Sequence, residues 1–161
     1  MPPDPEIFAL AQQVGDGLRR HGRSIAVAES CTGGMLGAAL TDVPGSSAYF
    51  LGGVISYADR VKVDQLGVSE ATFRQYGAVS EQTAAAMASG VRQLLQADIG
   101  VSITGVAGPD AEGAKPVGLT FIGIAAEAST THRFQWTGDR WDNRRRSVIA
   151  ALELLVQVLG L

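Results

Sequence analysis

The sequence has little of what metal and redox sites need. Among 161 residues there is one cysteine, Cys31, and there are two histidines, His21 and His132. A single cysteine excludes an internal disulfide and a cysteine-based zinc cluster within one chain. The two histidines are far apart, and neither is followed by a second ligand at metal-binding spacing. We therefore expect no metal site.

Long hydrophobic runs and basic patches are also missing. No window approaches the roughly 18 uninterrupted apolar residues that a membrane span needs. Residues 1–5 contain three prolines and no apolar run, unlike a secretory signal. The formal net charge is −3, and the positive residues are scattered apart from Arg144, Arg145 and Arg146, which argues against a nucleic-acid surface. We expect a soluble, cytoplasmic protein that binds neither membranes nor nucleic acid.

What is present suits one compact α/β domain over residues 1–161. Hydrophobic residues make up 46% of the chain and charged residues 18%, which is enough apolar surface for a continuous core. Periodicity and capping residues predict helices over 5–21, 33–40, 59–65, 69–76 and 81–97, and after Asp139. Short β-branched or apolar runs predict strands over 24–28, 49–57, 99–104, 117–126 and 131–136. The last two strands should form a hairpin, so we predict a three-layer α/β/α sandwich around a mixed sheet.

Two segments are irregular within this pattern. The strand over 49–57 contains Gly52 and Gly53, which indicates a bulge or a close approach to the backbone. Residues 105–116 hold three glycines and two prolines, and are predicted to form a long surface loop between buried strands. Loops of this kind often carry function.

Ser30 lies where a buried strand ends and a helix opened by Gly33 and Gly34 is predicted to begin. Unpaired backbone N–H groups at such a junction suit the oxyanion that forms during acyl transfer. A simpler interpretation is that Ser30 and Thr32 only cap the helix. The GxSxG elbow of α/β-hydrolases is absent.

A nucleophilic serine needs a base, and neither histidine is placed to suggest a triad. Lys62 comes five residues after Tyr57, just past the glycine-containing strand, and a lysine beside a partly buried cleft can lose its proton well below its solution pKa. The alternatives are that Lys62 is an exposed helix residue, or that Lys115 is the base.

Two further places could bind a ligand. Thr104 and Gly105 end a buried strand in a run of small residues, where a ligand could lie against backbone, although an ordinary exit loop has the same composition. Arg140 and Arg144 are four residues apart and share a helix face, which suits a phosphate or, equally, a solvated basic surface.

The segment Ala28-Glu-Ser-Cys-Thr-Gly-Gly34 resembles the signature of the CinA C-terminal domain family, the nicotinamide-nucleotide amidases. The resemblance extends in order through Tyr57 with Lys62, Leu66-Gly-Val68, Gly77-Ala-Val-Ser80, Ser102-Ile-Thr-Gly-Val-Ala-Gly-Pro-Asp110, Lys115-Pro-Val-Gly118 and Gly138-Asp-Arg140. Together these motifs cover nearly the whole chain. Residues 110–115 depart from the family pattern, being shorter and less glycine-rich.

The resemblance implies hydrolysis of nicotinamide mononucleotide to nicotinate mononucleotide and ammonia by a serine enzyme that tends to form homodimers. Ser30 then corresponds to the nucleophile and Lys62 to the base, with no metal or organic cofactor. Tyr57, Thr32, Gly33, Gly34, Thr104, Gly105, Arg140 and Arg144 correspond to the substrate-binding residues. Many relatives also carry an N-terminal nucleotide-pyrophosphatase-like domain, and without it we expect deamidation alone.

Three alternatives stay open from the sequence. Cys31 is a rival nucleophile, although we expect it to pack as a small apolar residue. The domain could bind a nucleotide without turning it over. It could also hydrolyse a different small amide.

Overall fold

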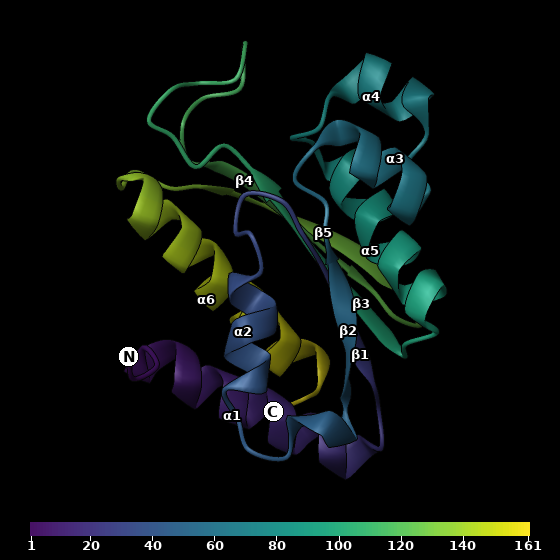
Figure 1. Ribbon diagram of the computed structural model, residues 1–161, viewed down its shortest axis with the longest axis vertical. Helices are drawn as coiled ribbons and strands as arrows, with labels where there is room; N and C mark the ends of the chain where they lie inside the picture. The colour runs from purple at the N-terminus through teal and green to yellow at the C-terminus, as the bar shows by residue number, and fades with distance from the viewer.

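A five-stranded mixed sheet organises the chain, and the computed structural model describes all 161 residues. The strand order is β2-β1-β3-β4-β5 (Figure 1). β1 pairs in parallel with both β2 and β3, whereas β4 runs antiparallel to β3 and to β5. The strands are β1 Ile25–Glu29, β2 Phe50–Ile55, β3 Ile99–Gly105, β4 Leu119–Ala125 and β5 Ser129–Gln135. The predicted mixed sheet and its hairpin are confirmed.

Helices cover both faces of the sheet, which confirms the three-layer α/β/α prediction (Figure 1). On one side lie α1 Pro5–His21, α2 Met35–Thr41 and α6 Arg140–Val158. On the other lie α3 Asp59–Leu66, α4 Glu70–Tyr76 and α5 Glu81–Leu95. A short 3-10 helix, Ser46–Ala48, leads into β2.

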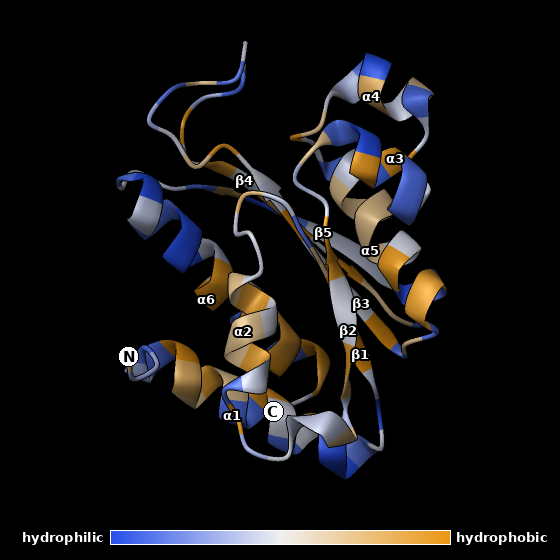
Figure 2. Cartoon of the chain, in the orientation of Figure 1, coloured by the Kyte–Doolittle hydropathy of each residue, from blue (hydrophilic) through white to orange (hydrophobic).

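The apolar residues form one large core and two smaller clusters. The large core joins β1, β3 and β4 to α1, α2 and α6, and one of the smaller clusters includes Leu66, Met87 and Val91 from α3 and α5. Figure 2 shows hydrophobic residues on the central strands, and α6 changing from hydrophilic at its N-terminal end to hydrophobic at its C-terminal end. No helix is both long and apolar enough to cross a bilayer.

Side-chain caps set the starts of three helices where the sequence predicted them. Ser69, Ser80 and Asp139 each accept a hydrogen bond from a backbone N–H in the first turn of α4, α5 and α6. The predicted start of the second helix at Gly33 was wrong, because Gly33 and Gly34 have φ of +59° and +104° and α2 begins only at Met35. Left-handed backbone of this kind favours glycine and cannot continue an α-helix.

The glycine pair in β2 behaves as predicted. The register with β1 shifts between Ile25, which pairs with Phe50, and Ala26, which pairs with Gly52, so one residue of β2 bulges out. A Cβ atom on Gly53 would lie 2.5 Å from the carbonyl oxygen of Val27. Only glycine permits that approach of the two strands.

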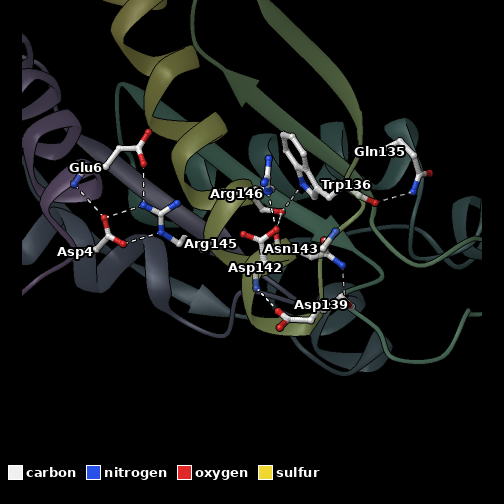
Figure 3. A network of polar contacts seen from close by, with 12 residues as sticks. Asp4, Glu6, Gln135, Trp136, Asp139, Asp142, Asn143, Arg145 and Arg146 are labelled. Atoms are coloured by element: carbon white, nitrogen blue, oxygen red, sulfur yellow. Dashed lines mark hydrogen bonds and ion pairs between the residues drawn. The ribbon is translucent and has the colours of Figure 1, made fainter.

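The run of basic residues at the start of α6 is mostly neutralised within the fold. Arg145 forms ion pairs with Asp4, at 2.7 Å, and with Glu6, at 2.8 Å, while Arg146 pairs with Asp142 at 2.7 Å (Figure 3). The two pairs of Arg145 tie the N-terminal end of α1 to α6. Arg144 points elsewhere, toward the loop after β1.

Candidate active site

The carboxyl ends of the three parallel strands meet at one edge of the sheet and surround a cavity of about 190 Å³. This edge is where open α/β sheets generally bind ligands. Six of the residues predicted for the site line the cavity: Ser30, Tyr57, Lys62, Thr104, Gly105 and Arg140. They come from segments that follow β1 and β2, from α3, from the end of β3 and from the start of α6.

Ser30 and Lys62 are in direct contact inside this cavity. The Nζ atom of Lys62 lies 3.0 Å from the Oγ atom of Ser30. The same Nζ lies 2.6 Å from the carbonyl oxygen of Ser56 and 3.1 Å from that of Tyr57. Lys62 is only 1% exposed, so the interpretation of an exposed helix lysine is wrong.

Burial lowers the pKa of Lys62 below that of an ordinary lysine, because desolvation disfavours the ammonium form. The carboxylates of Asp59, 4.0 Å away, and Glu112 oppose this effect. Two N–H bonds of Lys62 are directed at the two carbonyls, which leaves its remaining tetrahedral position toward Ser30. In the neutral amine that position holds the lone pair, which can accept the serine proton.

The loop between β1 and α2 is held from inside by a buried carboxylate that the sequence analysis did not select. Glu29 is 1% exposed, and its carboxylate accepts hydrogen bonds from the Thr32 hydroxyl at 2.7 Å and from the backbone N–H groups of Leu36 and Gly37, both at 2.9 Å. The amides at the start of α2 are therefore occupied. The predicted unpaired N–H groups beside Ser30 are therefore not those of α2 but those of the loop before it, such as that of Cys31.

Several other backbone amides next to the cavity have no acceptor in the chain, including those of Cys31, which directly follows Ser30, and Ala107. Val106 donates its N–H to Leu119 and accepts from Gly118, so both of its polar groups face β4. Ala107 comes next, beyond the end of β3, and its N–H has no acceptor while its carbonyl accepts a hydrogen bond from Asn143. The amides of Cys31 and Ala107 are therefore candidate donors for an oxyanion.

Tyr57 and Arg140 meet at the cavity mouth. Tyr57 is 60% exposed, and its hydroxyl accepts a hydrogen bond from the Nη2 atom of Arg140 at 3.2 Å. Arg140 also donates to the carbonyl of Gly108. Deeper in the cavity, the Thr104 hydroxyl donates to the carbonyl of Ala78 at 2.9 Å.

Four of the residues predicted to bind substrate do not line the cavity: Thr32, Gly33, Gly34 and Arg144. Thr32 is fully buried against Glu29. The glycines form the turn into α2, and Arg144 donates to the backbone carbonyls of Cys31 and Thr32. Substrate contacts by these four residues stay predictions. In the structure they form or contact the loop between β1 and α2.

Cys31 and Lys115 fit the chemistry less well than Ser30 and Lys62. Cys31 is part of the large core, and burial raises the pKa of its thiol to about 11, so it is not a thiolate near neutral pH. Lys115 is outside the cavity, in a turn where its backbone is hydrogen-bonded to that of Glu112.

The comparisons with known proteins agree with this architecture. The model of the CinA C-terminal domain matches residues 7–159, so the chain belongs to the CinA C-terminal domain family. A "CinA-like protein" from Chlorobium limicola is 51% identical over 150 residues, covering 89% of this chain and 35% of that protein. The crystal structure of the competence/damage inducible protein CihA from Agrobacterium tumefaciens is 36% identical, with a TM-score of 0.95 and complete coverage of both chains.

A second solved structure, a CinA superfamily protein from Klebsiella pneumoniae, is 32% identical with a TM-score of 0.93, covering 96% of this chain and 98% of that one. The chain spans only about a third of the length of the curated relatives that it matches.

Proposed function

We propose that this domain hydrolyses the carboxamide of nicotinamide mononucleotide, giving nicotinate mononucleotide and ammonia. The observation that carries the proposal is the 3.0 Å contact between a buried lysine amine and the hydroxyl of Ser30. Membership of the CinA C-terminal domain family supports it, because the motifs by which the sequence resembles that family include both residues of this pair.

In the acylation step, neutral Lys62 accepts the hydroxyl proton of Ser30 while the serine oxygen bonds to the carboxamide carbon. The carbonyl electrons move to oxygen, and the amides of Cys31 and Ala107 stabilise that charge. When the carbonyl re-forms, the carbon–nitrogen bond breaks. The Lys62 ammonium returns its proton to the departing nitrogen, which leaves as ammonia.

Deacylation repeats the same steps with water. Water takes the place that ammonia has left, Lys62 accepts its proton, and the water oxygen bonds to the carbonyl carbon of the nicotinyl ester. The ester bond to Ser30 then breaks, and Lys62 protonates the serine oxygen. One lysine serves both half-reactions because it is neutral again at the end of each.

The charges around the cavity suit a substrate that is cationic at one end and anionic at the other. Asp59, Asp110 and Glu112 line the cavity and would attract the pyridinium ring. Arg140, at the mouth, is exposed and could contact the phosphate. The carboxamide would then reach Ser30 from the open side.

The direct test is ammonia release from nicotinamide mononucleotide by the wild-type chain and by Ser30→Ala. We expect the variant to lose turnover by at least about a thousandfold, since nucleophile removal in serine hydrolases costs this much or more. Ser47→Ala, at an exposed serine, is the matched control. Full activity in Ser30→Ala would refute the assignment, and full activity in Cys31→Ser would exclude the thiol.

The same assay separates the alternatives. Binding of nicotinamide mononucleotide by the wild-type chain without ammonia release would indicate a binding module. Ammonia release from other amides in a substrate panel, with none from the mononucleotide, would indicate a different amidase.

A further inference from the structure

Three side chains on one face of α6 bond to backbone carbonyls on both sides of the cavity. Arg140 donates to Gly108, and the Nδ2 atom of Asn143 donates to Ala107 at 3.0 Å. Arg144 donates through Nε to Cys31 at 3.0 Å and through Nη2 to Thr32 at 3.1 Å. Positions i, i+3 and i+4 of a helix lie on the same face, so one rigid element spans the two loops.

The contacts of Arg144 determine where the amides after Ser30 point. Each peptide unit is planar and trans, so holding its carbonyl oxygen also fixes the direction of its N–H. Arg144 holds the Cys31–Thr32 and Thr32–Gly33 peptides, while the N–H of Gly33 holds the Ser30 carbonyl at 3.0 Å. Three successive peptides after the nucleophile are therefore fixed, including the one that carries the N–H of Cys31.

A direct role for Arg144 in binding phosphate fits these contacts poorly. Arg144 is half-buried, it does not line the cavity, and its guanidinium is engaged with two carbonyls. Arg140 is exposed and lies at the mouth. The two arginines share a helix face, and yet only one of them borders the space where substrate would lie.

We propose that Arg144 is a positioning residue that orients the nucleophile loop, and that it does not bind the substrate phosphate. This inference rests on the proposed amidase function. Arg144 acts through the backbone of Cys31 and Thr32, keeping the Cys31 amide directed at the oxyanion. Its loss therefore lowers the rate of acylation without weakening recognition of the phosphate.

The kinetic test uses two substrates, nicotinamide mononucleotide and nicotinamide riboside, which lacks the phosphate. Arg144→Met should lower kcat about a hundredfold for both substrates, comparable to the loss of one oxyanion donor, and leave the ratio of their KM values nearly unchanged. Arg140→Met should raise KM for the mononucleotide more than for the riboside. Arg146→Met, at an exposed arginine of the same helix, is the matched control.

A selective rise in KM for the mononucleotide in Arg144→Met, with kcat preserved, would overturn the proposal in favour of phosphate binding. Guanidinium added to Arg144→Ala should restore part of kcat, because the free cation can occupy the vacated space beside the two carbonyls. Thermal unfolding identifies variants that fail to fold. Arg144→Lys retains the charge but cannot make the two-pronged contact, so it should remain impaired.

A second measurement does not depend on the substrate. A fluorophosphonate probe reacts with an activated serine hydroxyl, and the wild-type chain should be labelled at Ser30. Arg144→Met should be labelled at least about tenfold more slowly, as expected when an oxyanion donor is displaced. Equal labelling rates would overturn the positioning role even if nicotinamide mononucleotide is not the substrate, whereas failure of ammonia release with slowed labelling would overturn only the proposed function.

Discussion

The two walls of the cavity differ in how firmly they are held. On one side, Ser30 and Lys62 are buried and bonded to each other, Lys62 also bonds to backbone carbonyls, and Glu29 holds the loop after Ser30. On the other side, residues 110–114 are exposed and extend away from the sheet (Figure 1). Backbone hydrogen bonds between Glu112 and Lys115 close this loop. The buried wall carries the proposed chemistry, and the exposed wall adds charge near the entrance.

This difference predicts which substitutions should change kcat, KM and stability. A buried polar group that loses its partner keeps the cost of desolvation, whereas an exposed group can turn to water. Changes in the buried wall should therefore affect kcat and stability together. Changes in the exposed loop should affect mainly KM.

The largest effect is expected from Lys62→Met. We predict that kcat falls by about 10³-fold or more, since a positioned base contributes roughly 10² to 10⁴ and the serine here has no other. The assay is ammonia release from nicotinamide mononucleotide at saturating substrate. A loss smaller than tenfold would show that another group takes the serine proton.

The same variant has a distinct effect on stability. Because burial lowers the pKa of Lys62 in the folded protein, the unfolded chain binds more protons between the folded pKa and the ordinary value near 10.5, and the wild-type free energy of unfolding rises with pH in that window. Methionine does not titrate. We therefore expect Lys62→Met to become less stable relative to the wild type as pH rises from 7 toward 10, when the free energy of unfolding is measured by urea titration at each pH. A difference that does not change with pH would contradict a lowered pKa of Lys62.

Glu29→Gln should have the next largest effect. A glutamine offers one acceptor oxygen in place of two, so at least one of the amides of Leu36 and Gly37, or the Thr32 hydroxyl, loses its partner. We expect a loss of about 1–3 kcal/mol in the free energy of unfolding, with a reduced kcat. Glu153→Gln, an exposed position on α6, is the control, and equal stability of the two variants would contradict the structural role of Glu29.

Asp59→Asn should shift the pH dependence. The Asp59 carboxylate, 4.0 Å from Lys62, raises the pKa of the lysine, so its removal should move the ascending limb of the kcat/KM profile to lower pH. Asp64→Asn on the exposed side of the same helix should leave the profile in place. A shift to higher pH in Asp59→Asn would contradict the proposed protonation state.

The smallest effect is expected from Glu112→Gln in the exposed loop. Glu112 is exposed, so the free energy of unfolding should change by less than about 0.5 kcal/mol. We expect a severalfold rise in KM for the cationic substrate, because one attractive charge at the cavity is lost. Urea unfolding gives the stability of the variant, and steady-state kinetics give its KM and kcat. A large loss of kcat would contradict the view that the exposed loop affects mainly KM.

Local signals in the sequence were sufficient for most of the fold. Hydrophobic periodicity and capping residues determine structure within a few residues along the chain. Ser80 and Asp139, for example, are the N-caps of α5 and α6 as predicted. The start of α2 was misplaced because two adjacent glycines are compatible with a helix in composition but adopt left-handed backbone here.

The candidate site was predictable where one segment carries its own signal, and less so where distant segments meet. Ser30 and Lys62 were selected from their positions after strands and from motif resemblance, and the structure brings their side chains into contact. Glu29 was missed because its burial depends on how α2 folds back onto it. The contacts of Asn143 with Ala107 and of Arg144 with Cys31 join residues 36 and 113 positions apart, which no local pattern indicates.

In the proposed mechanism, Lys62 is a largely desolvated amine that is neutral when Ser30 attacks. The chain has only two lysines, Lys62 and Lys115, so Lys115→Arg leaves one, and lysine labelled with ¹³C at Cε gives a single side-chain signal to follow by NMR. Titration of that signal should have its midpoint below the ordinary lysine value near 10.5 and should coincide with the ascending limb of kcat/KM. A midpoint at or above 10.5, with catalysis already at its plateau near neutral pH, would contradict the role of neutral Lys62 as the base.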